Sequence, residues 1–140
     1  MSECKIALIG ATGAVGQVFL RILEERNFPA SDIRLCASER SFGKKIKVRG
    51  EKLIVEEATP QLLSEVDFVF ISASGSVSRQ MAPLAVDQGA IVIDKSSAFR
   101  MDPTVPLVVP EINPGDLHDH HGIIASPNCT TTPMVMALKP

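Results

Sequence analysis

The sequence predicts an α/β protein built on a doubly wound, mostly parallel sheet, and three observations support this. Short, almost entirely apolar runs recur along the chain, as at residues 5–9 and 90–94, and such runs are typical of strands buried on both faces of a parallel sheet. Amphipathic stretches of helical length lie between them. A glycine-rich turn joins the first run to the first of these stretches. Together these features indicate a Rossmann-like fold in which helices connect parallel strands.

The N-terminal part of the chain predicts a strand–helix–strand unit. Residues 5–9 form its first strand, and residues 27–29 (Asn-Phe-Pro) end the helix that follows. Residues 33–37 form the second strand, which should run parallel to the first after a right-handed crossover. The helix is predicted from apolar residues that recur at helical spacing: Val15, Val18, Phe19, Ile22 and Leu23.

The later part of the chain continues the alternation and then becomes irregular. Residues 44–57 alternate around a turn and predict a small hairpin. Thr59 followed by Pro60 is typical of an N-cap and first helical position, so a short helix should run through residue 64. The remaining predicted elements are a strand at 67–72, a helix that follows a turn at 74–76 and runs to about Gln88, where Gly89 ends it, a strand at 90–94, short strands at 107–109 and 123–125, and a helix opening at 127–129.

The composition excludes several classes of protein. Apolar residues make up 45% of the 140 residues and charged residues 21%, which is ordinary for a globular domain. The 14 basic and 16 acidic residues form no block of like charge, so we expect no nucleic-acid partner. No apolar run approaches the roughly 18 residues needed to cross a bilayer, so we expect no membrane partner.

The two ends of the chain carry further expectations. The N-terminus shows neither a basic nor an apolar signal region, and the three cysteines form no metal or disulfide pattern, so a cytoplasmic location is expected. The C-terminus ends within an apolar helical pattern, which predicts a fragment of a longer protein. We therefore expect a cofactor-binding domain over residues 1–127 and the start of a truncated second domain over 128–140.

The glycine-rich turn predicts a dinucleotide site. Gly10, Gly13 and Gly16 lie between a strand and an amphipathic helix. A pyrophosphate must approach backbone N–H groups closely, which Cβ atoms would prevent, and the helix N-terminus offers free N–H groups to an anion. The spacing is one residue longer at its start than the usual GxGxxG pattern. A tight turn without a ligand is the alternative.

The end of the second predicted strand favours NADP as the cofactor. There Arg40 is flanked by the hydroxyls of Ser38 and Ser41, and a guanidinium matches the oxygens of a 2′-phosphate. Glu39 is the counter-argument, because a carboxylate there could bind the 2′-hydroxyl of NAD. A solvated loop with no role in cofactor binding is the third interpretation of these residues.

Cys129 is the candidate nucleophile. It follows Ser126-Pro127-Asn128 at a predicted strand-to-helix turn, and a helix N-terminus lowers the pKa of a thiol. A thiolate beside a nicotinamide suggests oxidation of an aldehyde through a thioester. Cys4 and Cys36, in or beside strands, should be ordinary apolar residues.

Five motifs occur together in order: GATGAVG, SERSFGKK, SSAFR, VPLVVPEIN and SPNCTTTPM. With them the chain resembles the N-terminal part of bacterial-type aspartate-semialdehyde dehydrogenase over essentially all its length. The resemblance implies the reversible, NADP-dependent conversion of 4-aspartyl phosphate to L-aspartate 4-semialdehyde and phosphate, on the route to lysine, threonine, methionine and diaminopimelate. It also implies that the full-length protein is a homodimer or homotetramer.

The resemblance assigns roles to individual residues. Cys129 would form the thioester, Asn128 would orient the substrate, and Arg100 would bind phosphate or the acyl phosphate. The implied cofactor contacts are Thr12, Gly13, Ala14, Val15, Arg40, Ser41, Ser72, Ala73, Ser74 and Gly75. Two residues depart from the family pattern: Lys95 stands where Asn is common, and Phe42 where Ala is common.

Some expectations concern what is missing. The general-base histidine of the family is not found in this sequence, so the 140 residues alone should catalyse the reaction very slowly. A non-catalytic NADP-binding module is therefore an alternative function. N-acetyl-glutamyl-phosphate reductase is another, weakened because the Asn-Cys-Thr context and the absence of Tyr do not fit it. The His and Asp residues of 116–121 read as a solvated loop, and no metal site is expected.

Overall fold

A computed structural model describes residues 3–139. No helix in this part of the chain combines the length and the hydropathy that crossing a membrane requires. In chain order the elements are β1 (Cys4–Ile9), α1 (Ala14–Glu25), β2 (Ala30–Cys36), the 3-10 helix η1 (Glu39–Ser41), β3 (Lys45–Val48), β4 (Glu51–Glu56), α2 (Pro60–Leu63), β5 (Phe68–Ile71), α3 (Gly75–Asp87), β6 (Ile91–Asp94), the 3-10 helix η2 (Pro114–Asp119), β7 (Ile123–Ala125) and α4 (Thr131–Leu138).

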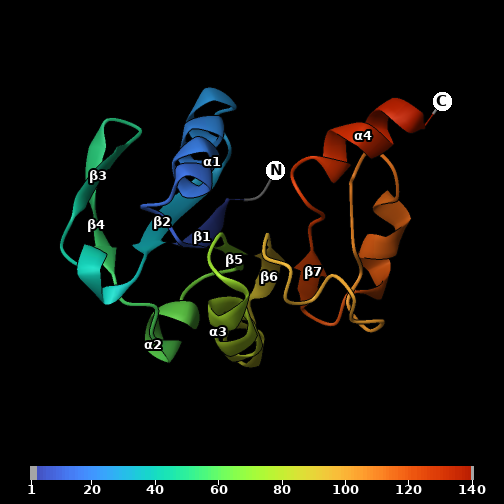
Figure 1. The fold of residues 1–140 in the computed structure, drawn as a ribbon. Helices are drawn as coiled ribbons and strands as arrows, with labels where there is room; N and C mark the ends of the chain where they lie inside the picture. The colour runs from blue at the N-terminus through green and yellow to red at the C-terminus, as the bar shows by residue number, and fades with distance from the viewer. Residues whose placement is uncertain (1–2, 140) are drawn as a thin grey trace.

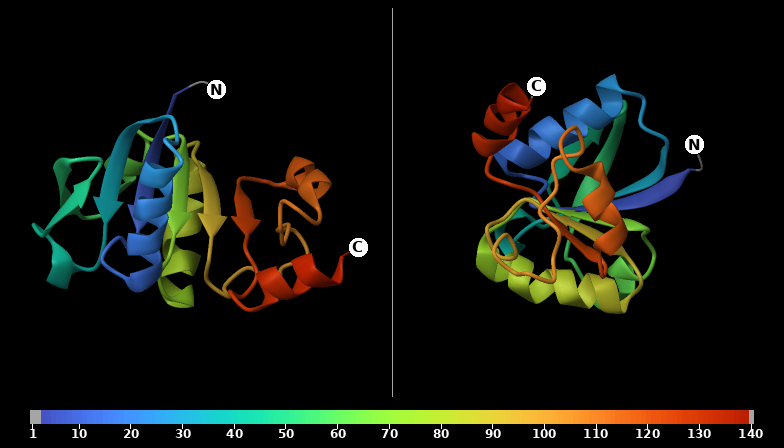
Figure 2. Two further views of the ribbon diagram at one scale, coloured as in Figure 1. Left: turned by 90° about the horizontal axis from the view of Figure 1, so that it is seen from above. Right: turned by 90° about the vertical axis from the view of Figure 1, so that its right-hand side faces the viewer.

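The strands form one sheet in the order β3-β4-β2-β1-β5-β6-β7, and Figure 2 (left) shows them side by side. All neighbouring pairs are parallel except the β3–β4 hairpin. Without β3, the order is that of a Rossmann sheet, with the direction of winding reversing at β1. The α/β, doubly wound, mostly parallel fold is therefore confirmed.

Helices cover both faces of the sheet, and strand β1 shows how its side chains serve both layers. Ile6 and Leu8 pack in one buried cluster with residues of α1, whereas Ala7 and Ile9 pack in another with residues of α2 and α3. Figure 1 shows α1 on one side of the strands and α2 and α3 on the other. Because β1 is buried on both faces, it reads in the sequence as a continuous apolar run.

Helix α1 differs from its predicted apolar stripe in which residues it buries. Gly16, Leu20 and Leu23 are its buried residues. Val15, Val18 and Ile22 are 51%, 43% and 40% exposed. The face toward the sheet is therefore set by a glycine and two leucines, and position 16 has room for only a hydrogen because the Gly10–Ala11 backbone lies against it.

Two further boundaries differ from the sequence expectation. Residues 107–109 form only an isolated bridge from Leu107 to Ala125 instead of a strand. The flanking Pro106 and Pro110 lack N–H donors, and the Val109 N–H is taken by the Asn113 side chain, which stops the ladder. The last helix begins at Thr131, later than expected, because the Asn128 side chain accepts the Thr130 N–H and shapes the preceding residues as a turn.

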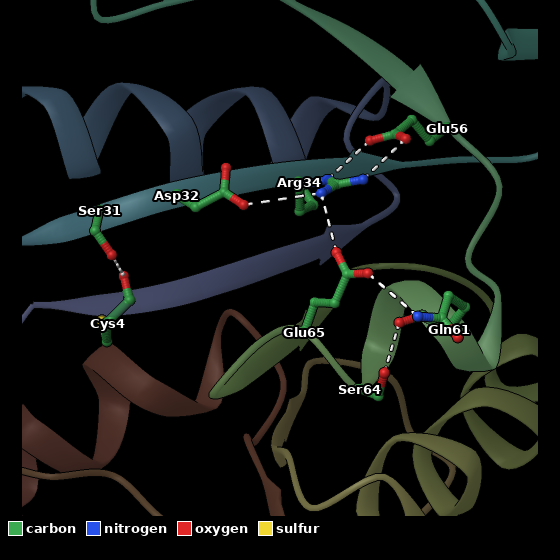
Figure 3. A network of polar contacts seen from close by, with 8 residues as sticks. All are labelled: Cys4, Ser31, Asp32, Arg34, Glu56, Gln61, Ser64 and Glu65. Carbon is green, nitrogen blue, oxygen red and sulfur yellow. Dashed lines mark hydrogen bonds and ion pairs between the residues drawn. The ribbon is translucent and has the colours of Figure 1, made fainter.

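An ion-pair network ties β2 and β4 to the residues that follow α2 (Figure 3). Arg34 on β2 donates to both carboxylate oxygens of Glu56 on β4, at 2.9 and 3.1 Å. Asp32 and Glu65 lie within 3.9 and 3.5 Å of the same guanidinium. The bonds to Glu56, and then the nearby carboxylates, raise the pKa of Arg34. The network holds β4 in the position from which the chain enters α2.

Candidate functional site

Two groups of predicted site residues lie at the carboxyl edge of the sheet. All the parallel strands end there, and Figure 2 (left) shows η1 and α4 toward the same edge. In a doubly wound sheet ligands bind at this edge, near the strand where the winding reverses. The first group surrounds the ends of β1, β2 and β5, and the second lies at the ends of β6 and β7.

A cleft of about 720 Å³ opens in the first group. Six predicted cofactor residues line it: Gly10, Thr12, Gly13, Ser38, Ser72 and Ala73. Predicted residues outside its lining are Ala14, Val15, Gly16, Arg40, Ser41, Ser74 and Gly75, which belong to the adjoining starts of α1 and α3 and to η1. The structure thus brings the separate cofactor segments together around one cavity.

The glycine turn is shaped by backbone packing. Gly10 has φ of +94°, and a Cβ there would lie 2.1 Å from the Ser72 carbonyl oxygen. A Cβ on Gly16 would lie 2.4 Å from the Gly10 carbonyl oxygen, so this glycine lets α1 approach the turn. Gly13 is the N-cap of α1 and has no side-chain cap. The first N–H groups of the helix therefore have no partner within it and suit an anion.

Hydroxyl and ammonium groups gather at the corner around η1. Thr12 Oγ1 lies 3.4 Å from Ser41 Oγ, and Lys44 Nζ donates to the same Ser41 oxygen at 3.5 Å. Arg40 is exposed beside them. This set of donors suits a phosphate. Glu39 also lines the cleft, so the structure leaves the carboxylate that argued for NAD at the site.

Sequence reasoning missed about half of the cleft lining. The missed residues are Ile9, Ala37, Phe42, Glu57, Ala58, Val77, Gln80 and Met81. Most are apolar residues at strand ends or on α3, where the sequence shows only ordinary core pattern. The apolar ones among them give the cleft an apolar wall beside the polar glycine turn.

A buried carboxylate organises the second group. Asp94 ends β6 and is fully buried, and it accepts hydrogen bonds from Ser78 Oγ at 2.7 Å, Ser96 Oγ at 2.7 Å and Ser96 N at 3.0 Å. The bond from Ser78 ties the strand end to α3. Sequence reasoning missed Asp94, although an acidic residue closing an apolar run and followed by two serines is a signal that could have identified it.

Arg100 joins two segments that are distant in sequence. Its Nε donates to the Ser126 carbonyl oxygen at 2.9 Å, and its Nη2 donates to the Lys95 carbonyl oxygen at 2.8 Å. Lys95 Nζ in turn donates to Ser126 Oγ at 2.7 Å. Both cations are half-buried. Much of the Arg100 guanidinium is therefore committed to holding the backbone, whereas its Nη1 makes no hydrogen bond within residues 3–139.

Cys129 is exposed and lies in the turn directly before α4. Asn128 Oδ1 accepts from Thr130 N at 2.8 Å and from Thr130 Oγ1 at 2.7 Å, so this amide shapes the turn that presents the thiol. Burial lowers the pKa of Lys95, and the charge of Arg100 lowers it further. The charge of Cys129 raises the pKa of Lys95, so this thiol and the Lys95 ammonium are close enough to interact.

The other cysteines behave as apolar residues. Cys36 is buried, and burial raises the pKa of its thiol to about 12. Burial also raises the pKa of Cys4, and Asp67 adds to that effect. In the 116–121 segment, His120 Nδ1 accepts from the Gly122 N–H. Within the described residues, no three His, Cys, Asp or Glu side chains come together as metal ligands would.

Comparisons with known proteins point to one family. The family described as "Semialdehyde dehydrogenase, NAD binding domain" matches residues 5–120. Aspartate-semialdehyde dehydrogenase of Bacillus subtilis is 55% identical over 135 residues, which are 96% of this chain and 39% of that protein. The chain thus spans about two fifths of the length of the curated relatives it matches.

Solved structures of aspartate-semialdehyde dehydrogenases also match the chain. Aspartate semialdehyde dehydrogenase II of Vibrio cholerae, in a complex with ASA, matches with a TM-score of 0.95 and 43% identity over 99% of this chain and 46% of that one. Aspartate semialdehyde dehydrogenase of Candida albicans, solved with NADP, matches with a TM-score of 0.80 and 29% identity over 99% of this chain and 46% of that one.

Proposed function

The chain belongs to the semialdehyde dehydrogenase family as its N-terminal NAD(P)-binding domain, and on that premise we propose that it forms the cofactor-binding and nucleophile-bearing part of an NADP-dependent aspartate-semialdehyde dehydrogenase. The proposed reaction is the reversible reduction of 4-aspartyl phosphate by NADPH to L-aspartate 4-semialdehyde, phosphate and NADP⁺. It would serve lysine, threonine, methionine and diaminopimelate synthesis in the cytoplasm. The full-length protein would act as a homodimer or homotetramer.

One observation carries the proposal. The glycine cleft and the Arg100–Cys129 group lie at the same edge of one sheet, so a cofactor and an acyl substrate could meet there. We assign residues 1–127 to cofactor binding and residues 128–140 to the nucleophile turn and the first helix of the catalytic part.

The residues present fit a dinucleotide. Gly13 leaves the first N–H groups of α1 open to a pyrophosphate, and Ala14, Val15 and Gly16 carry those groups. Ser38, Arg40 and Ser41 would bind the 2′-phosphate. Ser72, Ala73, Ser74 and Gly75 would hold the far side, with Ser74 capping α3. When bound, the dinucleotide supplies or accepts the hydride of the reaction.

The second group would perform the acyl chemistry. The Cys129 thiolate attacks the carbonyl carbon of aspartyl phosphate, a thioester forms and phosphate leaves. Arg100 holds the phosphoryl oxygens with its remaining N–H donors. Asn128 is fixed through its Oδ1, and its Nδ2 has no hydrogen bond within residues 3–139, so that donor is available to the substrate.

Titration with NADPH, followed by nicotinamide fluorescence, tests the cofactor part. The chain has no Trp and no Tyr, so the protein contributes almost no background fluorescence. We expect NADPH to bind more tightly than NADH, and Arg40→Ala to weaken NADPH by about tenfold because a charge-assisted contact is lost. Arg21→Ala, on the exposed side of α1, is the control. Equal affinities for NADPH and NADH would contradict the 2′-phosphate site.

The same samples distinguish the enzyme from a non-catalytic NADP-binding module. Cys129 should be alkylated faster than Cys4 and Cys36, as mapped by mass spectrometry of the peptides. NADPH binding together with an inert Cys129 would favour the module.

A further inference from the structure

The end of β6 and the turn after β7 hold two half-buried cations side by side. Lys95 and Arg100 are connected through Ser126, whose side-chain and main-chain oxygens accept from Lys95 and Arg100 respectively. Ion pairs within residues 3–139 all involve Arg21 or Arg34, so neither cation has a carboxylate partner in that part of the chain. Cations that lose water on burial are normally paired with an anion.

The nearest acidic residue in sequence does not supply that anion. Asp94 precedes Lys95 directly, but its carboxylate is buried and occupied by Ser78 and Ser96. Burial and Arg100 both lower the pKa of Lys95, and the charge of Cys129 is the one that raises it. An added anion near this ammonium would favour its charged form in the same way.

The hydrogen bonds leave N–H donors on both cations for an anion. Arg100 uses Nε and Nη2 on the carbonyl oxygens of Ser126 and Lys95. Lys95 uses one of the three N–H groups of its ammonium, on Ser126 Oγ. An ammonium is also a compact point charge whose remaining donors rotate to meet an anion.

We propose that Lys95 is a second binding residue for the anionic group of the substrate, acting with Arg100 beside Cys129. The proposal rests on the proposed function, because the anion is taken to be the phosphoryl group of an acyl phosphate or the phosphate that attacks the thioester. Ser126 sets the distance between the two cations, since both donate to it.

The experiment compares two alkylating agents on Cys129 in the whole chain at neutral pH. Iodoacetate is an anion and iodoacetamide is neutral, and both react with the thiolate. The ratio of their rate constants therefore reports the local positive field and is independent of how much thiolate is present. The extent of reaction at Cys129 is read by mass spectrometry of its peptide, which separates it from Cys4 and Cys36.

We expect Lys95→Met to lower the iodoacetate-to-iodoacetamide ratio by about three- to tenfold, because one nearby positive charge is removed. Lys95→Arg should keep the ratio within about twofold of the unmodified chain, since the charge is retained. Lys52→Met, on the hairpin at the opposite edge of the sheet, is the matched control and should leave it unchanged. Inorganic phosphate should slow iodoacetate more in the unmodified chain than in Lys95→Met.

A ratio unchanged by Lys95→Met, in a variant with the circular dichroism spectrum of the unmodified chain, would overturn this proposal. So would an equal loss in Lys95→Arg, because that would indicate a packing role. Either result would leave the proposed function standing if NADPH still binds and Cys129 still reacts, so the two failures are distinguishable.

Discussion

The two groups at the carboxyl edge of the sheet are built in different ways. Around Gly10 the chain is shaped by backbone packed on backbone, with no room for a Cβ between the turn and Ser72. Around Asp94 and Arg100 it is shaped by side chains that reach carbonyl and hydroxyl groups of distant segments. The predicted cofactor site therefore depends mainly on the close approach of backbone segments. The predicted site of the reacting group depends on particular polar side chains.

The largest effect should come from adding a methyl group in the first region. Gly10→Ala should lower the free energy of unfolding by about 4 kcal/mol, because its Cβ meets the Ser72 carbonyl. Gly89→Ala is the matched control: its φ of +91° is nearly the same, and no atom lies within 4 Å of its Cβ. It should cost about 1 kcal/mol of backbone strain. Urea unfolding followed by circular dichroism measures both, and equal losses would refute the packing argument.

The second effect concerns the buried carboxylate of the other region. Asp94→Ala removes three hydrogen bonds and leaves the Ser78 and Ser96 donors unpaired, which should cost about 3 kcal/mol. Ser78→Ala removes one of the bonds and should cost about 1 kcal/mol. The same unfolding measurement applies. A loss in Asp94→Ala no larger than that in Ser78→Ala would show that the region does not depend on this side chain.

The third effect separates the regions by pH. Cys36, whose carbonyl accepts the Gly10 N–H, has a folded pKa of about 12, above the unfolded value of about 8.5. Its contribution to stability is therefore complete below about pH 8.5 and is lost as the pH rises toward 12. Between about pH 8 and 9.5 the free energy of unfolding should fall by about 1 kcal/mol.

Cys36→Ala should flatten that pH slope, whatever it does to stability at neutral pH. Cys129→Ala, at the exposed thiol of the second region, should leave the slope in place. A slope that persists in Cys36→Ala would assign the titration to another group.

The smallest effect should come from the Arg34 network, which is built from side chains but is partly exposed (Figure 3). The side chains of Arg34 and Glu56 are 28% and 41% exposed, so solvent screens the pair. Arg34→Met should cost about 1 kcal/mol or less, and added NaCl should reduce the difference. A cost as large as that of Asp94→Ala would mean that burial does not explain the contrast between the two regions.

Most of the fold could be predicted from the sequence because its signals are local. The apolar runs of β1, β5 and β6, the Thr59-Pro60 helix start and the hairpin follow from side-chain period and backbone preference within a few residues. Gly10 is needed where the chain adopts a positive φ, and the sequence shows a glycine there. The prediction of Cys129 as the nucleophile likewise comes from its sequence neighbours.

Only the tertiary structure decided which distant residues meet. The bond from Ser78 to Asp94, the clamp of Arg100 on Ser126 and the apolar wall of the cleft join residues far apart in the chain. The pattern of apolar residues in the sequence indicates that a strand is buried. The order of strands in the sheet decides which strand ends lie together. The late start of α4 likewise depends on the Asn128 hydrogen bonds, which compete with helical ones. The sequence alone thus determined most of the elements and predicted residue types for the site, whereas packing determined their neighbours, because contacts between distant segments depend on how the whole sheet is assembled.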